Sequence, residues 1–269
     1  MEPGTLVYIN YVSKVKDTGE VLEATKEEDA KSLSVYDPSV KYRPRLVSVG
    51  DGWVLKGLDE ALLKANVGDK FSIEIPPDKA FGERDPSKVR LMPLRKFGED
   101  VSKLKVGEQV EVDNRIGIVR YIGSGRVQLD FNHRLAGKVI SYEVEVVRAV
   151  TEADDVVRSL LLRRIPVDQE KVKIAIEDGA AKVELPEESY FMDGLQYAKK
   201  TIADEVFKHI KTIKKLVFVE SYYSPEAKKE EVEVKKTEEV KAEQKTVTRR
   251  RTKQRVALAR GSSLLESGE

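Results

Sequence analysis

The sequence predicts an α+β protein made of three folded units and a charged C-terminal segment. Its 269 residues exceed one domain of ordinary size and are enough for two or three. Short β-branched and aromatic runs separated by Gly, Pro and Asp turns dominate the chain up to residue 150. Helical and strand patterns alternate after Thr151, and the chain from Pro225 to Val256 is almost wholly charged and polar. That segment buries too little apolar area to offset its ordering entropy, so we expect a solvated helix or a disordered tail.

Composition excludes several kinds of chemistry. The formal net charge is only +1, so bulk charge points to neither a nucleic-acid nor a membrane partner. The absence of cysteine removes disulfides, thiolate nucleophiles and thiolate metal sites. With His133 and His209 as its only histidines, the chain also argues against a histidine metal cage, and we expect no metal and no cofactor.

The location that we expect is the cytoplasm. No apolar run is long enough to span a bilayer. The first residues, Met1 to Gly4, lack the basic and apolar regions of a signal peptide.

The first unit has the pattern of strands around one short helix. Leu55, Leu58, Ala61 and Leu62 share one face of that helix. The other elements expected here are the strands Leu6–Val12, Val21–Ala24, Leu46–Val49 and Phe71–Ile75, a polar helix within Lys26–Leu33, and a long strand from Lys138 to Val147.

A second unit with its own core interrupts the first. Strand patterns at 116–122 and 126–131 flank Gly123-Ser124-Gly125, which predicts a hairpin, and a strand through Val110 and Val112 precedes it. The stretch around Pro93 is expected to be too broken for regular structure.

The third unit is predicted to have the order α-β-β-α-β. A helix runs from Thr151 to about Arg164, and two strands then bracket the turn Asp178-Gly179. Apolar residues from Leu195 to Ile213 have helical spacing, and Leu216–Tyr223 is expected to be a closing strand.

Several motifs resemble those of one family of isomerases. Val49–Leu62 resembles the pocket segment of FKBP-type peptidyl-prolyl cis–trans isomerases, in which a strand runs into a short helix beneath the substrate proline. Val67–Lys70 and Pro77–Gly82 follow at the family's spacing, and Asn132–Lys138 is similar to the SlyD-like branch. The third unit is similar to what long-chain archaeal members carry after the isomerase.

The resemblance implies a fold and a division into domains. The fold is an FKBP-like bent antiparallel sheet around a short helix, with an inserted small β-rich domain and a C-terminal α+β domain. The implied domains are an isomerase domain at 1–84 plus 132–150, an insert-in-flap chaperone domain at 85–131, an accessory domain at 151–224 and a charged tail at 225–269.

The resemblance also implies a pocket. Its lining would be Tyr11, Leu22, Val54, Leu55, Leu58, Phe81 and Tyr142. Glu23 would either face the substrate carbonyl or serve as a structural hydrogen-bond acceptor, and the two roles are equally favoured. The backbone N–H of Leu55 would hold a substrate carbonyl. Three departures from the family pattern imply weak macrolide binding. Leu58 stands in place of a tryptophan, Phe81 in place of a tyrosine, and Arg45 in an otherwise apolar wall.

Two further side chains near the pocket attract attention. Trp53, one position before Val54, is expected at the surface or rim and not in the pocket. His133 is interpreted as a residue that stabilises a turn, in preference to a general base.

The insert offers a candidate surface for client binding. Five apolar residues in it are either ordinary core or an adaptable groove for unfolded chains, and the second interpretation is slightly preferred. They are Val89, Leu91, Met92, Leu94 and Phe97. The basic cluster Arg249–Arg255 lacks interleaved aromatic residues, so a solvated tail is preferred over contact with RNA or a ribosome.

The hypothesis is a folding helper that rotates X-Pro bonds in unfolded or nascent polypeptides held by the insert. A homodimer through the C-terminal domain is left open. The alternative is a non-catalytic holdase or interaction protein with a degenerate peptide-binding pocket. No nucleophile–base pair, phosphate loop or metal spacing supports another kind of enzyme.

Overall fold

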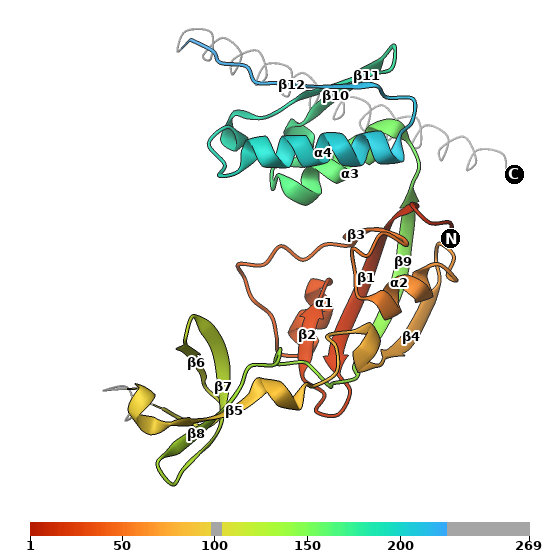
Figure 1. Cartoon of the computed structure of the whole chain (residues 1–269). Helices are drawn as coiled ribbons and strands as arrows, with labels where there is room; N and C mark the ends of the chain where they lie inside the picture. Colours follow the sequence, from red (N-terminus) through yellow and green to blue (C-terminus); the bar gives the residue numbers. More distant parts are fainter. Residues whose placement is uncertain (98–103, 225–269) are drawn as a thin grey trace, which may run out of the picture.

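A computed structural model describes residues 1–97 and 104–224 of the chain. Figure 1 shows three sheets in these residues: a central five-stranded sheet, a four-stranded insert beyond one of its ends, and a C-terminal unit beyond the other. The long strand β9 leads directly toward α3 of the C-terminal unit (Figure 1). Among the described residues, no helix combines the length and the apolar character needed to cross a bilayer.

The central sheet is bent around one short helix. Its strands are antiparallel in the order β2-β1-β9-β4, with β3 paired to β1. The strands are β1 (Leu6–Val15), β2 (Val21–Ala24), β3 (Arg45–Ser48), β4 (Lys70–Ile75) and β9 (Ile140–Val150), and the helices are α1 (Glu27–Ser32) and α2 (Lys56–Leu62).

Two irregularities let β1 curve over α2. The register shifts at Tyr8/Ile9 against β9 and at Ser13/Lys14 against β2. Such shifts bend a strand and increase its twist. Alternate side chains of β1, including Val7, Ile9 and Tyr11, pack in the same core as α2, as expected for one face of a strand.

The insert is a four-stranded antiparallel sheet in the order β5-β8-β7-β6. Its strands are β5 (Val89–Pro93), β6 (Gln109–Val112), β7 (Arg115–Gly123) and β8 (Arg126–Asp130). The predicted hairpin is confirmed: Ser124 and Gly125 have φ of 50° and 72°, the left-handed conformation that tight hairpin turns require.

One prediction for the insert is wrong. The stretch around Pro93 is not broken: it forms β5, which pairs with β8 from Val89 to Pro93. Proline is tolerated here because β5 is an edge strand, where a missing N–H interrupts no ladder on the open side.

The C-terminal unit has the predicted order α-β-β-α-β. Its elements are α3 (Ala153–Arg164), β10 (Lys173–Glu177), β11 (Ala180–Glu184), α4 (Leu195–His209) and β12 (Lys215–Val219), with β12 parallel to β11. Helix α4 ends at His209 and not at Ile213, because the backbone of Ile210 is extended with φ of −120°. Ile213 remains buried, as a core residue beyond the helix.

The C-terminal unit packs directly on the central sheet. Leu6, Leu46 and Val150 belong to the same apolar core as α3 and α4. His209 Nδ1 lies 3.1 Å from the carbonyl oxygen of Gly4, and Lys208 forms a 2.6 Å ion pair with Asp51. These contacts fix α3 and α4 beside the strands that lead to the candidate site.

Candidate functional site

An apolar cluster over α2 contains every residue of the predicted pocket lining. Leu58, Tyr11 and Tyr142 are buried, with exposed fractions of 0%, 3% and 9%. The partly buried members packed against them include the remaining predicted residues, which are Leu22, Val54, Leu55 and Phe81. The structure therefore brings together side chains from β1, β2, β9, α2 and the loops before α2 and after β4.

The two tyrosines come from neighbouring strands. Tyr11 on β1 and Tyr142 on β9 place their ring centroids 5.4 Å apart with the planes inclined by 53°. Tilted aromatic pairs of this kind are favourable beyond the area that they bury. The strand pairing thus builds an aromatic wall at a fixed angle.

Asp59 holds the loop that leads into α2. Its carboxylate accepts the N–H of Gly50 at 2.7 Å and that of Gly52 at 2.9 Å. Gly50 has φ of +81°, a conformation that glycine adopts without strain. This bracing positions Val54 and Leu55 at the edge of the apolar cluster.

An unpaired backbone donor lies at the start of α2. Leu55 is the residue before the first turn, and within the described ranges its N–H has no hydrogen-bond acceptor. The first N–H groups of a helix have no partner within the helix and can bind a ligand carbonyl. The Leu55 N–H is thus available for its predicted role of binding a substrate carbonyl.

Glu23 lies at the polar rim of the cluster. Its carboxylate accepts the hydroxyl of Tyr11 at 2.7 Å and pairs with Arg45 at 2.7 Å. The Arg45 guanidinium also lies over the Tyr11 ring, 5.7 Å from its centroid. Arg45 was expected to interrupt the apolar wall. It instead forms an ion pair with Glu23 at the edge of the cluster.

Both tyrosine hydroxyls remain protonated in this setting. Burial raises the pKa of Tyr11, and its hydrogen bond to Glu23 acts in the same direction. Burial also raises the pKa of Tyr142, with the negative charge of Glu23 as the next cause. The two tyrosine hydroxyls therefore present neutral hydrogen-bonding groups to the apolar cluster.

His133 stabilises a turn, as expected. Its Nδ1 accepts the N–H of Leu135 at 3.3 Å. Its ring stacks on Phe81, with centroids 4.8 Å apart and planes within 9°. Phe81 is therefore held at the cluster by a ring on its other face.

Trp53 has a larger role than the rim position expected for it. It packs against both the central core and the core of the C-terminal unit. The guanidinium of Arg163 from α3 lies 3.6 Å from the centre of its ring system. Sequence register placed Trp53 outside the pocket but could not indicate what would cover it.

The five predicted client-binding residues do not form one exposed surface. Leu91 is exposed and Val89 is half-buried, whereas Met92, Leu94 and Phe97 pack against the small core of the insert. Met92 and Leu94 are half-buried, because part of each side chain packs on the small core around Val127.

Other apolar side chains are exposed on the insert. Ile116 and Tyr121 on β7 have exposed fractions of 66% and 53%. Sequence reasoning missed both. Ile116 could have been found, because it is three residues from buried Val119 and therefore faces the opposite side of the strand.

Some predictions lie outside the described residues. The basic cluster Arg249–Arg255 and the rest of the tail belong to residues 225–269, so the structure says nothing of them. Among the described residues, no three His, Asp or Glu side chains gather as a metal ion would require.

Comparison with known families finds matches in three stretches of the chain. Residues 1–94 match the family model described as FKBP-type peptidyl-prolyl cis-trans isomerase. Residues 90–135 match "FKBP26, IF domain", and residues 153–223 match "FKBP26_C-terminal". The class of protein is therefore a peptidyl-prolyl isomerase with additional domains.

Curated relatives agree with this assignment. A short-type peptidyl-prolyl cis-trans isomerase of Methanocaldococcus jannaschii is 30% identical over 146 residues, which are 54% of this chain and 92% of the relative. An FKBP-type 16 kDa isomerase of Escherichia coli K12 is 32% identical over 108 residues, 39% of this chain and 72% of the relative. A SlyD of Pasteurella multocida is 36% identical over 95 residues, 34% and 47% respectively. The chain belongs to the family of FKBP-type peptidyl-prolyl cis–trans isomerases.

Proposed function

We propose that this chain rotates X-Pro bonds of unfolded polypeptides in the cluster of Tyr11, Leu58 and Tyr142. One observation carries the proposal: a buried aromatic and aliphatic cluster lies beside the N–H of Leu55, which has no acceptor among the residues that the structure describes. The family match favours this function over a non-catalytic holdase.

The chemistry requires no nucleophile. Rotation about a peptide bond has a barrier of ~18–20 kcal/mol because amide resonance is lost in the twisted state. An apolar pocket disfavours the planar, more dipolar amide relative to the twisted one, which lowers the barrier. Leu58 and the two tyrosines would surround the proline ring, while the Leu55 N–H would bind a neighbouring carbonyl.

Glu23 has two roles open to it. Its bonds to Tyr11 and Arg45 support a structural role, since they orient the Tyr11 ring. A direct role opposite the substrate carbonyl requires that Arg45 or Tyr11 release the carboxylate. The first role is consistent with the contacts present and is the one that we propose.

The insert would act as the client-holding domain, inserted in the flap of the isomerase. Exposed apolar residues on a soluble domain mark surfaces for protein contact. Leu91, Ile116 and Tyr121 are the exposed residues that support this role. A client held there would present its prolyl bonds to the pocket at a raised local concentration.

The C-terminal unit would add assembly. Phe191 and Tyr197 have exposed fractions of 87% and 84%, which supports an interface, and a homodimer through this unit is the proposal. We also propose a cytoplasmic location, where nascent chains would be the clients.

The decisive experiment compares two tyrosines. Tyr142→Ala should lower kcat/KM on a short Ala-Leu-Pro-Phe peptide on the order of tenfold or more, equivalent to about 1.4 kcal/mol of barrier. Tyr121→Ala should leave the peptide reaction unchanged and slow a proline-limited refolding reaction of a protein client. Tyr142→Phe keeps the ring and controls for unfolding of the Tyr142→Ala variant.

The outcomes separate the two functions. Equal turnover by the wild type and Tyr142→Ala would contradict the proposed pocket. An absence of turnover in the folded wild type, with suppression of client aggregation retained, would establish the holdase instead.

A further inference from the structure

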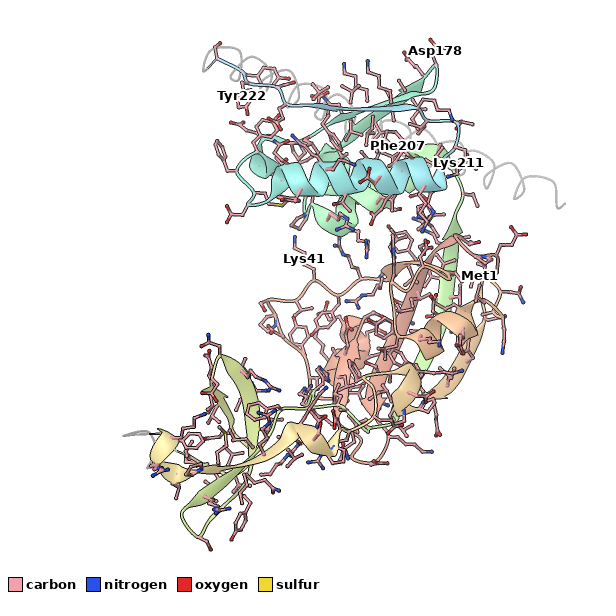
Figure 2. The ribbon with its side chains drawn as sticks, viewed as in Figure 1. Met1, Lys41, Asp178, Phe207, Lys211 and Tyr222 are labelled. Carbon is pink, nitrogen blue, oxygen red and sulfur yellow. The ribbon has the colours of Figure 1, made fainter. Side chains whose placement is uncertain are left out.

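A groove runs between the central sheet and the C-terminal unit, beside the apolar cluster. It has a volume of about 780 Å³. One wall is the segment from Val40 to Leu46, and the other is the end of α3 from Ser159 to Arg164. Figure 2 shows Lys41 on the first wall, facing the helices of the C-terminal unit.

The groove is strongly basic. Of its lining residues, Glu23 is the one that carries a negative charge, and six carry a positive charge. The basic residues are Lys41, Arg43, Arg45, Arg148, Arg163 and Arg164. Including Asp155 and Glu205, which pair with three of the arginines, six positive side chains face three carboxylates and three positive charges remain uncompensated.

Two of the cations are available to a ligand. Lys41 and Arg43 are exposed, and within the described residues neither forms an ion pair. Arg43 makes a 3.4 Å hydrogen bond to the carbonyl of Leu162 across the groove, which holds its guanidinium at the opening. An arginine fixed in this way can bind a carboxylate through its remaining donors.

The interior of the groove also accumulates positive charge. Burial lowers the pKa of Arg163; the negative charge of Glu205 opposes this shift, and the charges of Arg164 and Arg45 act with burial. Arg163 nevertheless remains charged, because an arginine side chain does not lose its proton in proteins. Arg163 and Arg164 share the single carboxylate of Glu205 and Arg45 pairs with Glu23, so an anionic ligand would be bound by Lys41 and Arg43 beside these paired arginines.

The groove continues into the candidate active site. Glu23 and Arg45 line the groove, and the same two side chains form the polar rim around Tyr11. Trp53 lines the groove and is followed directly by Val54 and Leu55 of the apolar cluster. A polypeptide with its proline in the cluster can extend into the groove without leaving the surface.

The aromatic residues of the groove do not favour a nucleic acid. Arg163 covers Trp53, Arg148 lies 4.6 Å from the centre of the Tyr8 ring, and Tyr42 stacks on Tyr36. Bases bind to single-strand sites by stacking on free aromatic faces. With those faces occupied, carboxylate side chains of a polypeptide are the better fit.

The geometry points to this groove as a subsite for acidic polypeptide segments that flank the isomerised X-Pro bond. The inference rests on the proposed isomerase function and specifies its substrate class. Clients with Asp or Glu near the proline would be preferred through Lys41 and Arg43, the two lining cations that form no ion pair among the described residues. The preference would weaken with salt, because partly exposed charges are screened.

The test uses the full chain and two matched peptides. Both contain Ala-Leu-Pro-Phe, one flanked on each side by three glutamates and the other by three glutamines. We expect kcat/KM for the acidic peptide to be about fivefold higher at low ionic strength, with the ratio near one at about 0.5 M salt. The double variant Lys41→Gln/Arg43→Gln should bring the ratio close to one at low salt, and Lys182→Gln/Lys215→Gln, the same charge change on exposed strands of the C-terminal sheet, should leave it unchanged.

Trp53 provides a second readout that is independent of catalysis. It is the single tryptophan of the chain, so the tryptophan emission comes from one residue that lines the groove. A glutamate-rich peptide without proline should change the emission of the wild type, and much less that of the double variant. An oligonucleotide that competes at lower concentration than the peptide would overturn the assignment to polypeptides.

The failures of the two proposals are distinguishable. If the wild type turns over both peptides with a ratio of kcat/KM values near one, the acidic subsite is overturned and the isomerase proposal stands. No turnover of the glutamine-flanked peptide, with the fluorescence change retained, would overturn the isomerase and leave an acidic binding groove.

Discussion

The central sheet and the insert treat their apolar side chains differently. In the central unit, the buried cluster extends from β1 and β9 across α2 and includes every predicted lining residue at least in part. In the insert, the described buried core consists of Val112, Val119, Val127 and Leu129, while Ile116 and Tyr121 remain exposed. An antiparallel sheet can bury one face and leave the other solvated, so apolar residues on the second face meet solvent.

This difference has a functional meaning. A pocket that excludes water needs rigid walls, and packing on both sides of β1 supplies them. A surface that holds varied clients needs exposed apolar groups on a small support. The insert is therefore suited to contact and the central unit to catalysis.

The largest expected effect comes from truncating one core leucine in each region. Leu62 and Leu129 are both fully buried, so replacement by alanine should cost ~2–5 kcal/mol in either place. Leu62→Ala should destabilise the central unit and abolish peptide turnover on mild heating. Leu129→Ala should destabilise the insert without destabilising the central unit, and should therefore preserve peptide turnover.

Hydrogen exchange resolved along the chain would measure this contrast. Faster exchange confined to β5–β8 in Leu129→Ala would confirm two separable cores. Faster exchange of β1 and β9 in the same variant would show that the regions unfold as one unit.

A smaller effect is expected at the joint between the two regions. Asp130 is buried and accepts hydrogen bonds from Arg84 at 2.8 Å, Arg120 at 3.2 Å and the N–H of Asn132 at 3.0 Å. Asp130→Asn should cost about 1–3 kcal/mol, because it removes the charge that Arg84 and Arg120 pair with and weakens the acceptor for the buried N–H of Asn132. The readout is exchange protection of the insert relative to the central sheet.

The same carboxylate predicts a pH dependence. Burial alone would raise the pKa of Asp130, but hydrogen bonds from Asn132 and Arg120 and the charge of Arg84 outweigh burial and lower it. A lowered pKa in the folded state stabilises the joint above the ordinary pKa of about 4, and this contribution is lost as pH falls below that value. Protection of the insert should therefore fall as the pH decreases below about 4 in the wild type, and Asp130→Asn should lack that step. An identical acid profile in both proteins would contradict the assignment.

The smallest expected effect tests the rigidity of the pocket wall. Tyr11→Phe removes the hydroxyl that donates to Glu23 and should lower the free energy of unfolding by about 0.5–1.5 kcal/mol. Tyr8→Phe is the matched control on the same strand, since the Tyr8 hydroxyl makes no hydrogen bond within the described ranges. In a denaturant titration, an unchanged dependence of the unfolding free energy on denaturant would show that the loss of stability is local. An equal loss of stability in both variants would contradict a special role for the Tyr11–Glu23 hydrogen bond.

Local patterns were sufficient to predict most elements and the composition of the pocket. The helix around Leu58, the hairpin at Ser124-Gly125 and the α-β-β-α-β order follow from spacing and turn residues that act within a few positions. The gathering of Tyr11, Leu58 and Tyr142 was predictable only through the family resemblance. Strand pairing brings Tyr11 and Tyr142 together across 131 positions of sequence, and Leu58 joins them from α2.

Other features depended on tertiary contacts alone. Pro93 suggested a broken stretch, but pairing with β8 on one side made it an edge strand. Tyr121 is exposed because the register shift between Val119 and Tyr121 breaks the alternation that sequence counting assumes. Helix α4 stops at His209, before its apolar pattern ends, since Ile213 reaches the core from the following turn.

The sequence by itself determined the periodicities, the turns and the apolar character of the pocket residues, because these depend on neighbours along the chain. Only the tertiary structure determined that Arg163 covers Trp53 and that Lys41 and Arg43 lie across the groove from α3. Those arrangements join segments more than a hundred residues apart, and their geometry is set by how the C-terminal unit packs on Leu6, Leu46 and Val150. Long-range packing of this kind leaves no periodic signal in the sequence, which is why the basic groove emerges only from the folded chain.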